Sequence, residues 1–278
     1  MKFFWSAIVV TFLMVGCAPL KNSPFSEETD TKLTNYNHVN LFDLESSQSL
    51  HDDEVVFGVI SDSHQNYMSL QDWVGVANNS DLDFTISLGD FTNQGLNFEY
   101  DAYLKSIVRL KKPHFTIMGN HDTLTKGKLL YRRIFGEYNF SFFEGGYKFI
   151  FFNNNRLDFL PIDLDWQWLE EELASSSLPK VMMMHVNPDN DEYFTAEQIE
   201  YFKEIFQSFN VRLVLHGHHH VFLTFNEGTY VRHQVQRTEG VYWSRITLSR
   251  EKVLVERCQR RECTHDISKD HSADLSYL

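Results

Sequence analysis

Six short runs of apolar, often β-branched or aromatic residues recur in the middle of this chain, and polar or turn-forming residues bound them. Runs of this length and composition are typical of buried strands. They are Val55–Ile60, Phe84–Leu88, His114–Met118, Phe149–Phe152, Val181–Met184 and Val211–Leu215. Any fold for this chain must therefore bury several short strands in one core.

Amphipathic helical patterns separate several of these strands. The clearest patterns lie within residues 96–110, 163–174 and 195–209, where apolar residues recur at helical spacing. Strands that alternate with helices indicate an α/β fold with a largely parallel sheet. After Val221 the strand-like runs follow one another closely, which predicts antiparallel hairpins that extend the core.

Residues of metal-ligating types follow five of the strand-like runs within a few positions. In chain order they are Asp62 and His64, then Asp90, then Asn120 with His121 and Asp122, then His185, and finally His218 and His220. In open α/β sheets, ligands bind just beyond the carboxyl ends of the strands. The sequence therefore predicts that these oxygen and imidazole donors meet at one rim.

The five blocks, in this order, resemble the DxH, GD, GNH, H and GHxH blocks of the calcineurin-like metallophosphoesterase superfamily. The resemblance covers roughly residues 55–255, and residues 135–153 and 163–173 resemble the branch that contains bacterial cyclic-nucleotide phosphodiesterases. It implies an α/β fold of the metallophosphoesterase type. This fold is a β-sandwich of two mixed sheets flanked by helices, with the metal site at the carboxyl ends of the strands.

Carried over position by position, the resemblance implies two metal ions and seven ligands. One ion would be held by Asp62, His64 and His220, the other by Asn120, His185 and His218, and Asp90 would bridge the two. Imidazole and carboxylate ligands suit Zn, Fe and Mn better than Ca or Mg. The expected cofactors are therefore two divalent or trivalent ions of Fe, Mn or Zn.

The resemblance also implies a mechanism, in which a hydroxide that bridges the metals attacks phosphorus in line with the leaving oxygen. His121, beside the ligand Asn120, would stabilise or protonate the leaving group. Asp122 would orient His121 through a hydrogen bond. The expected catalytic residues are therefore His121 and Asp122.

Three further histidines receive other interpretations. His216 is expected to pack behind the ligands, and His114, at the start of a strand, is expected to be structural. His219 lies between two expected ligands and could face either substrate or solvent, and the sequence leaves both possibilities open.

The first seventeen residues predict an export signal with a lipid anchor. Lys2 precedes the apolar run Phe3–Val15, which is shorter than the about 20 residues that span a bilayer. The following residues, ending at Cys17, resemble the lipobox of bacterial lipoproteins, whose cysteine is lipidated after cleavage. Leucine lies one residue earlier than usual, at Leu13, and an ordinary signal peptide with a chance cysteine is the alternative.

The net charge of the 278-residue chain is −13. An acidic chain of this kind lacks the broad basic surface of nucleic-acid binding proteins. The expected partners are a small phosphoester substrate and a membrane, reached through the lipid anchor. The expected location is the bacterial cell envelope, on the periplasmic side or the outer surface, and the oligomeric state is left open.

We expect four regions along the chain. They are a signal peptide with its lipobox (1–17), a polar, flexible tether (18–53), the metallophosphoesterase domain (54–257) and a polar C-terminal tail (258–278). Cys258 and Cys263 flank a polar stretch, and a disulfide between them is plausible in an exported protein.

These observations favour an exported dimetal phosphoesterase that hydrolyses phosphomonoester or phosphodiester bonds. The motifs do not separate these two substrate classes. A non-catalytic surface lipoprotein that uses the same fold for binding is the alternative. Such a protein would be expected to have lost a ligand or His121, and this chain retains all of them.

Overall fold

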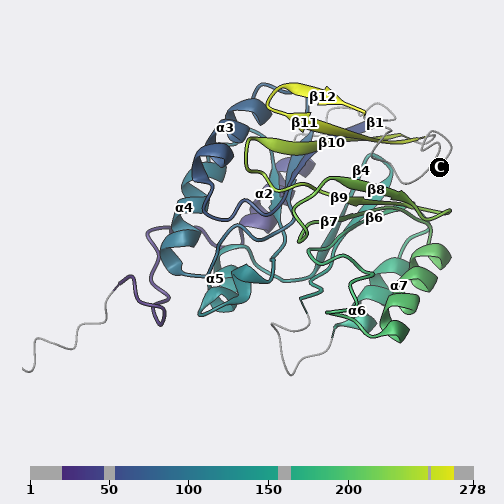
Figure 1. Cartoon of the computed structure of the whole chain (residues 1–278), viewed down its shortest axis with the longest axis horizontal. Helices are drawn as coiled ribbons and strands as arrows, with labels where there is room; N and C mark the ends of the chain where they lie inside the picture. Colours follow the sequence, from purple (N-terminus) through teal and green to yellow (C-terminus); the bar gives the residue numbers. More distant parts are fainter. Residues whose placement is uncertain (1–20, 47–53, 156–163, 250–251, 266–278) are drawn as a thin grey trace, which may run out of the picture.

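The computed structural model describes residues 21–46, 54–155, 164–249 and 252–265. Within these ranges the chain forms two six-stranded sheets, with helices on the outer faces of both (Figure 1). A core of side chains from both sheets lies between them. The predicted α/β sandwich of two mixed sheets flanked by helices is confirmed.

The first sheet combines the first strands of the domain with the last. From edge to edge it contains β12 (Glu262–Thr264), β11 (Val253–Gln259), β10 (Tyr242–Ser249), β1 (Glu54–Ile60), β2 (Phe84–Ser87) and β3 (His114–Thr116). Strands β1, β2 and β3 run parallel, and β10 lies antiparallel to β1. The carboxyl ends of the three parallel strands therefore lie at one edge.

The second sheet is mostly parallel. Its order is β4 (Phe140–Glu144), β5 (Tyr147–Phe151), β6 (Lys180–Met183), β7 (Val211–His216), β9 (Val231–Gln234) and β8 (Leu223–Asn226). Strands β8 and β9 form a predicted hairpin, but β9 lies parallel to β7, and β10 then crosses to the first sheet. The crossing segment is fixed where the N–H of Thr238 donates to the carbonyl oxygen of Ser61 at 3.1 Å.

Helices cover the outer face of each sheet (Figure 1). On the first sheet lie α3 (Tyr67–Ala77), α4 (Asn97–Ile107) and α5 (Gly127–Ile134), and on the second lie α6 (Trp166–Ala174) and α7 (Ala196–Ser208). The three helices predicted from periodicity are α4, α6 and α7. Helix α7 begins with a capping box, in which Thr195 and Gln198 each bond the other's backbone N–H.

Aromatic side chains dominate the core between the sheets. Phe57 and Phe84 stack with ring centroids 5.1 Å apart, and Phe149 meets Phe84 edge to face at 5.3 Å. Full burial of such a side chain contributes about 1.5–3 kcal/mol. This packing gives the strand ends a rigid base.

Residues 21–46 differ from the flexible tether predicted for them, because they pack against the domain. Helix α2 (Tyr36–Ser46) covers the outer edge of β3. Asn37 Oδ1 accepts from the N–H of Thr116 at 2.9 Å, and Asn40 Oδ1 accepts from the N–H of His114 at 2.8 Å. The helix thereby satisfies strand N–H groups that would otherwise form an open sheet edge.

The predicted signal peptide and Cys17 lie outside the described residues. Among the helices of the described ranges, none has the length and apolar character needed to cross a membrane.

The C-terminal segment also differs from its prediction as a polar tail. Strand β11 continues to Gln259 and pairs with β12, and a disulfide joins the facing residues Cys258 and Cys263. Cys258 is fully buried against the helices of the first sheet. The folded domain therefore reaches at least to the end of β12.

Candidate metal centre

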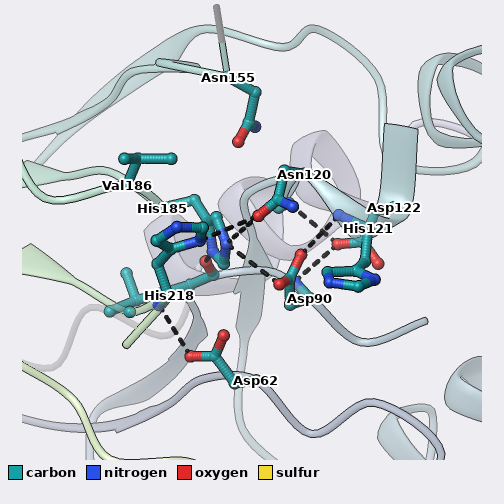
Figure 2. Close-up of polar contacts among 12 residues, drawn as sticks. Asp62, Asp90, Asn120, His121, Asp122, Asn155, His185, Val186 and His218 are labelled. Atoms are coloured by element: carbon teal, nitrogen blue, oxygen red, sulfur yellow. Dashed lines mark hydrogen bonds and ion pairs between the residues drawn. The ribbon is translucent and has the colours of Figure 1, made fainter. Parts of the chain in front are cut away.

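All seven candidate ligands come together at the carboxyl edge of the strands, where the sequence places them. Asp62 and His64 follow β1, Asp90 follows β2, Asn120 follows β3, His185 follows β6, and His218 and His220 follow β7. Figure 2 shows side chains from both sheets directed toward a common space, among them Asp90, Asn120 and His218. The sandwich thus delivers donors to one site from strands far apart in the sequence.

The donors form two adjoining groups. The ligand atoms of Asp62, His64 and His220 lie within 4.8 Å of one another, and so do those of Asp90, His185 and His218. Asn120 joins the second group, because its Oδ1 lies 3.0 Å from both His185 Nε2 and His218 Nδ1. These sets match the two ions that the resemblance implies, while the role of each residue as a ligand stays a prediction.

The hydrogen bonds of the histidines suit metal binding. The Nδ1–H of His64 donates to the carbonyl oxygen of Thr92 at 3.0 Å, and that of His185 donates to Leu88 at 2.7 Å. Each contact turns Nε2 toward the shared space, as in many metal sites, where it can bind an ion once it carries no proton. His64 Nε2 lies only 3.4 Å from His220 Nε2, so one cation could meet both nitrogens.

A buried oxygen of Asp62 also favours a bound cation. Asp62 is fully buried, and its Oδ1 accepts no hydrogen bond from any described residue. It lies 3.3 Å from His220 Nε2. A buried carboxylate oxygen without a donor costs free energy unless a cation meets it, so the residues present fit a metal ion.

Burial and neighbouring charges set the protonation of the second group. Burial raises the pKa of Asp90, but the nearby imidazoles, that of His185 foremost, together outweigh burial and lower this pKa to about 2. Burial lowers the pKa of His185, yet Asp90, 3.3 Å away, raises it to about 10. Without an ion the pair is therefore a carboxylate and an imidazolium, and a bound cation would take the place of this proton.

Five of the seven candidate ligands have left-handed backbone conformations, which non-glycine residues rarely adopt. Their φ angles are 50° for Asp62, 45° for His64, 53° for Asp90, 74° for His218 and 62° for His220. Each such residue costs about 1–2 kcal/mol. Strained residues of this kind cluster at functional sites, and here the sharp turns aim side chains at the shared space.

Asp122 makes different contacts from those predicted for it. Its buried carboxylate accepts from the backbone N–H groups of Asp90 and Thr92 at 2.8 Å and of Gly119 at 2.9 Å. The short 3-10 helix η2 (His121–Thr123) turns this side chain inward, and Figure 2 shows it beside Asp90. Asp122 therefore holds the backbone around the candidate ligand Asp90, rather than orienting the ring of His121.

The carbonyl oxygen of Asn93 orients His121 instead. The Nδ1–H of His121 donates to it at 2.8 Å. The ring lies at right angles to that of His64, with the centroids 5.0 Å apart. His121 is therefore a neighbour of the first ligand group, with Nε2 left for other contacts.

Glu99, which the sequence analysis did not single out, fixes the loop that carries this carbonyl. Its buried carboxylate accepts from the N–H groups of Asn93 and Gln94 at 3.1 Å and of Leu96 at 3.0 Å. It also accepts from Gln65 Nε2 at 2.7 Å. Glu99 lies in the first turn of α4, where a glutamate often accepts hydrogen bonds from the preceding backbone. This position is the sequence feature from which its role could have been predicted.

Two asparagines of the loop after β5 support the centre from the side. Asn154 Oδ1 accepts from the N–H groups of His185 and Val186 at 3.2 and 3.1 Å. Asn155 Nδ2 donates to the carbonyl oxygen of Met118 at 2.7 Å. This polar loop therefore links the ends of β3 and β6 beside the candidate ligands.

The three other histidines interpreted from the sequence differ in their surroundings. His216 is fully buried, and burial holds its pKa well below the usual range, as expected for a packed residue. His114 is buried too, and its ring contacts the hydroxyls of Thr85 and Tyr103 at 2.9 and 3.0 Å. His219 is exposed, and its Nε2 lies 3.4 Å from Asn190 Nδ2.

The three consecutive histidines should respond differently to replacement by alanine. His218 and His220 belong to different ligand groups, so each variant should lose mainly one ion and, with it, most of the turnover. His219→Ala should keep both ions and at most change substrate affinity. Metal stoichiometry and turnover, measured on all three variants, test this. Loss of a metal from His219→Ala, with both ions kept in the other two, would contradict the assignment.

The sequence model of the calcineurin-like phosphoesterase family matches residues 55–222, more than half of the chain. The chain belongs to this family. The match spans every candidate ligand from Asp62 to His220. No curated protein sequence matches the chain.

Solved structures of other proteins share the fold of this family member. A dimetal phosphatase from Danio rerio aligns with a TM-score of 0.61 at 14% identity, over 76% of this chain and 98% of its own. A purple acid phosphatase from yellow lupin (Lupinus luteus) seeds aligns with a TM-score of 0.63 at 12% identity, over 77% of this chain and 53% of its own. GAP50, the anchor in the inner membrane complex of Plasmodium, aligns with a TM-score of 0.60 at 12% identity, over 81% and 89%.

Proposed function

We propose that this calcineurin-like phosphoesterase is an exported, metal-dependent hydrolase of phosphomonoesters or phosphodiesters. The two adjoining groups of ligand atoms carry the proposal, because two ions held side by side suit displacement at phosphorus. The names of two similar structures, a dimetal phosphatase and a purple acid phosphatase, support it.

Metal ions held by these residues would neutralise charge on the phosphate oxygens and acidify a bound water molecule. Two of the chain's own residues would position the groups around the metal ions and the leaving oxygen. Asp122 holds the Asp90 turn in place through its backbone contacts. His121, fixed through Nδ1–H to the Asn93 carbonyl, can present a protonated Nε2 to the leaving oxygen.

Replacing His121 with alanine should keep the metal and lose about 10²–10⁴-fold in turnover, the usual contribution of a general acid. The loss should be smaller for nitrophenyl esters, whose leaving group needs less protonation. Turnover of nitrophenyl and alkyl esters, with metal content measured on the same samples, tests this. His219→Ala is the matched control, and equal losses for both esters would count against His121 as the acid.

The class of substrate is the next question for experiment. Scavenging of extracellular nucleotides, or cleavage of phosphoesters of the cell envelope, suits a protein in the proposed envelope location. Metal analysis of the purified protein, combined with a panel of monoesters, diesters and cyclic nucleotides, addresses function and substrate class together. Protein that binds two ions but hydrolyses none of the panel would contradict the proposed activity.

We further propose that Cys17 carries a lipid that anchors the protein in the envelope. Cys17→Ser should leave either the uncleaved precursor or a soluble form, because the modified thiol is absent. The mass of the mature N-terminus, from protein made in its native host, measures this. An unmodified N-terminus at Ala18 or later would rule out the anchor.

A binding protein without turnover is the second candidate. The fold similarity to a Plasmodium protein described as an anchor favours it. Against it, the candidate ligands lie together and His121 lies beside them. The substrate panel separates the two candidates, since only the hydrolase turns over.

A further inference from the structure

The N-terminal segment is fastened to the body at one end of α4. The Nδ2 group of Asn97, the first residue of α4, donates to the carbonyl oxygen of Lys21 at 2.7 Å and to that of Glu28. The carboxylate of Asp101 accepts from the N–H groups of Asp30 and Thr31 at 2.8 and 3.1 Å. In Figure 1 this purple segment passes beside α4 and α5. Lys21 is therefore held at the first turn of α4.

The first turn of α4 lies at the same edge as the candidate metal centre. Helices α3, α4 and α5 follow the parallel strands β1, β2 and β3, so each begins at the carboxyl edge of the sheet. The loop that leads into α4 also carries Asn93, which holds His121. The described chain thus starts at the edge where the candidate ligands lie.

Large apolar side chains are exposed at this same edge. In the first turns of α3, α4 and α5, Met68 is 80% exposed, Phe98 42% and Leu129 52%. Phe25, in the fastened segment, is 84% exposed, and Val221, directly after His220, is 47% exposed. Single exposed apolar residues are ordinary, but several at one edge are typical of a surface that meets an apolar partner. We call these five residues the apolar rim.

The short distance along the chain to Cys17 limits which face can meet a membrane. Three residues separate Cys17 from Lys21, and the four steps from one Cα atom to the other span at most about 14 Å when the chain is fully extended. A folded domain of this size is roughly 40 Å across. A lipid on Cys17 can therefore enter a bilayer only if the bilayer lies near the edge that holds Lys21.

We propose that the apolar rim docks on the surface of the membrane that holds the lipid, so that the metal centre opens toward the lipid headgroups. The inference rests on the proposed lipid anchor. A lipid on a flexible tether would only keep the domain close to the membrane. The fastened segment and the apolar rim would also set which face of the domain lies against the membrane. The hydrolase would then act on phosphoesters presented at the membrane interface.

Environment-sensitive labels on the full lipidated protein test the orientation. The variants Met68→Cys and Phe98→Cys place a label on the rim, and Val108→Cys and Phe42→Cys are matched controls. Val108 is 48% exposed at the C-terminal cap of α4, the opposite end of the same helix. Phe42 is 67% exposed on α2, which runs from the Thr116 end of β3 toward its His114 end, away from the rim. Cys258 and Cys263 are joined and do not compete for the label.

In vesicles of phosphatidylcholine and phosphatidylglycerol, the labels at 68 and 98 should shift to shorter emission wavelengths. Nitroxide-bearing lipids should quench them several-fold more strongly than the labels at 108 and 42. The difference should persist at high salt, because an apolar contact is not screened. Equal quenching at all four positions, loss of the difference in salt, or burial of the rim labels only by another envelope protein would each overturn the proposal.

Two readouts on the same samples separate this inference from the proposed function. If the labels show no preferred orientation while nitrophenyl phosphate is still hydrolysed and Cys17 carries lipid, only the inference fails. If the mass of the N-terminus shows no lipid, the anchor and the inference fail together. Hydrolysis of the soluble ester then decides the proposed activity independently.

Discussion

Replacing Asp90 with asparagine should abolish hydrolysis and empty both candidate metal positions. Asp90 is buried, and one carboxylate oxygen lies 3.3 Å from His185 Nε2 while the other accepts from the N–H of His121 at 2.9 Å. The amide keeps the shape of the side chain but removes the charge that two cations would share. Loss of several kcal/mol of charge stabilisation corresponds to more than about 1,000-fold in rate.

Metal content and kcat/KM of the purified variant measure this effect. Asp72→Asn is the matched control, because Asp72 is an exposed aspartate of α3 that contacts only the surface residue Arg260 among the described ion pairs. The control should retain both ions and full activity. An Asp90→Asn variant with two ions and normal turnover would overturn the bridging role, and loss of one ion alone would assign Asp90 to a single metal.

Gly217→Ala should disrupt the metal centre and destabilise the fold. A Cβ atom at this position would lie 1.9 Å from Ser61 Oγ and 2.6 Å from Asp62 Oδ2. Overpacking of this kind costs about 1–3 kcal/mol. The nearest atoms belong to Ser61 and Asp62, just after β1, so we expect the candidate ligand Asp62 to be displaced. A displacement of about 1 Å can cost 10²-fold in rate.

Thermal unfolding and metal titration of Gly217→Ala test both effects. Adding Ser61→Ala removes the closest clash but leaves that with Asp62, so stability should partly return while metal affinity stays low. Gly75→Ala is the control, since nothing lies within 4 Å of a Cβ there. In a helix interior it should be neutral or slightly stabilising. Normal metal affinity in Gly217→Ala would show that the turn can relax.

The positions of the candidate ligands were predictable because each one follows a strand. Asp62, Asp90 and His185 come within two residues of the end of an apolar run, and parallel strands end at a common edge. Strand boundaries and the approximate helices follow from the same periodicity. The same stretches of sequence therefore predicted both the candidate site and the architecture.

Features built from polar contacts were not predictable in this way. Helix α2 docks through Asn37 and Asn40 together with the buried Leu44, while Tyr36 and Leu41 are only partly buried. A pattern of hydrophobic residues cannot reveal such a face. Asp122 lies next to His121 in sequence, but the short helix η2 directs its carboxylate to backbone N–H groups instead. The parallel pairing of β9 with β7 was not predicted either, because strands close together in sequence are expected to pair as antiparallel hairpins.

The pairing of β1 with β10 has a consequence for biosynthesis. Val59 lies opposite Ser244, so β1 can pair with β10 only after nearly the whole domain has been synthesised. At about 5–20 residues per second, β1 waits many seconds with an open hydrogen-bonding edge. Contacts so distant in sequence slow folding, and a nascent chain in this condition can be threaded through a translocation channel before it folds. Premature termination before residue 242 would leave the same edge exposed for good, and such fragments should aggregate rather than form a smaller domain.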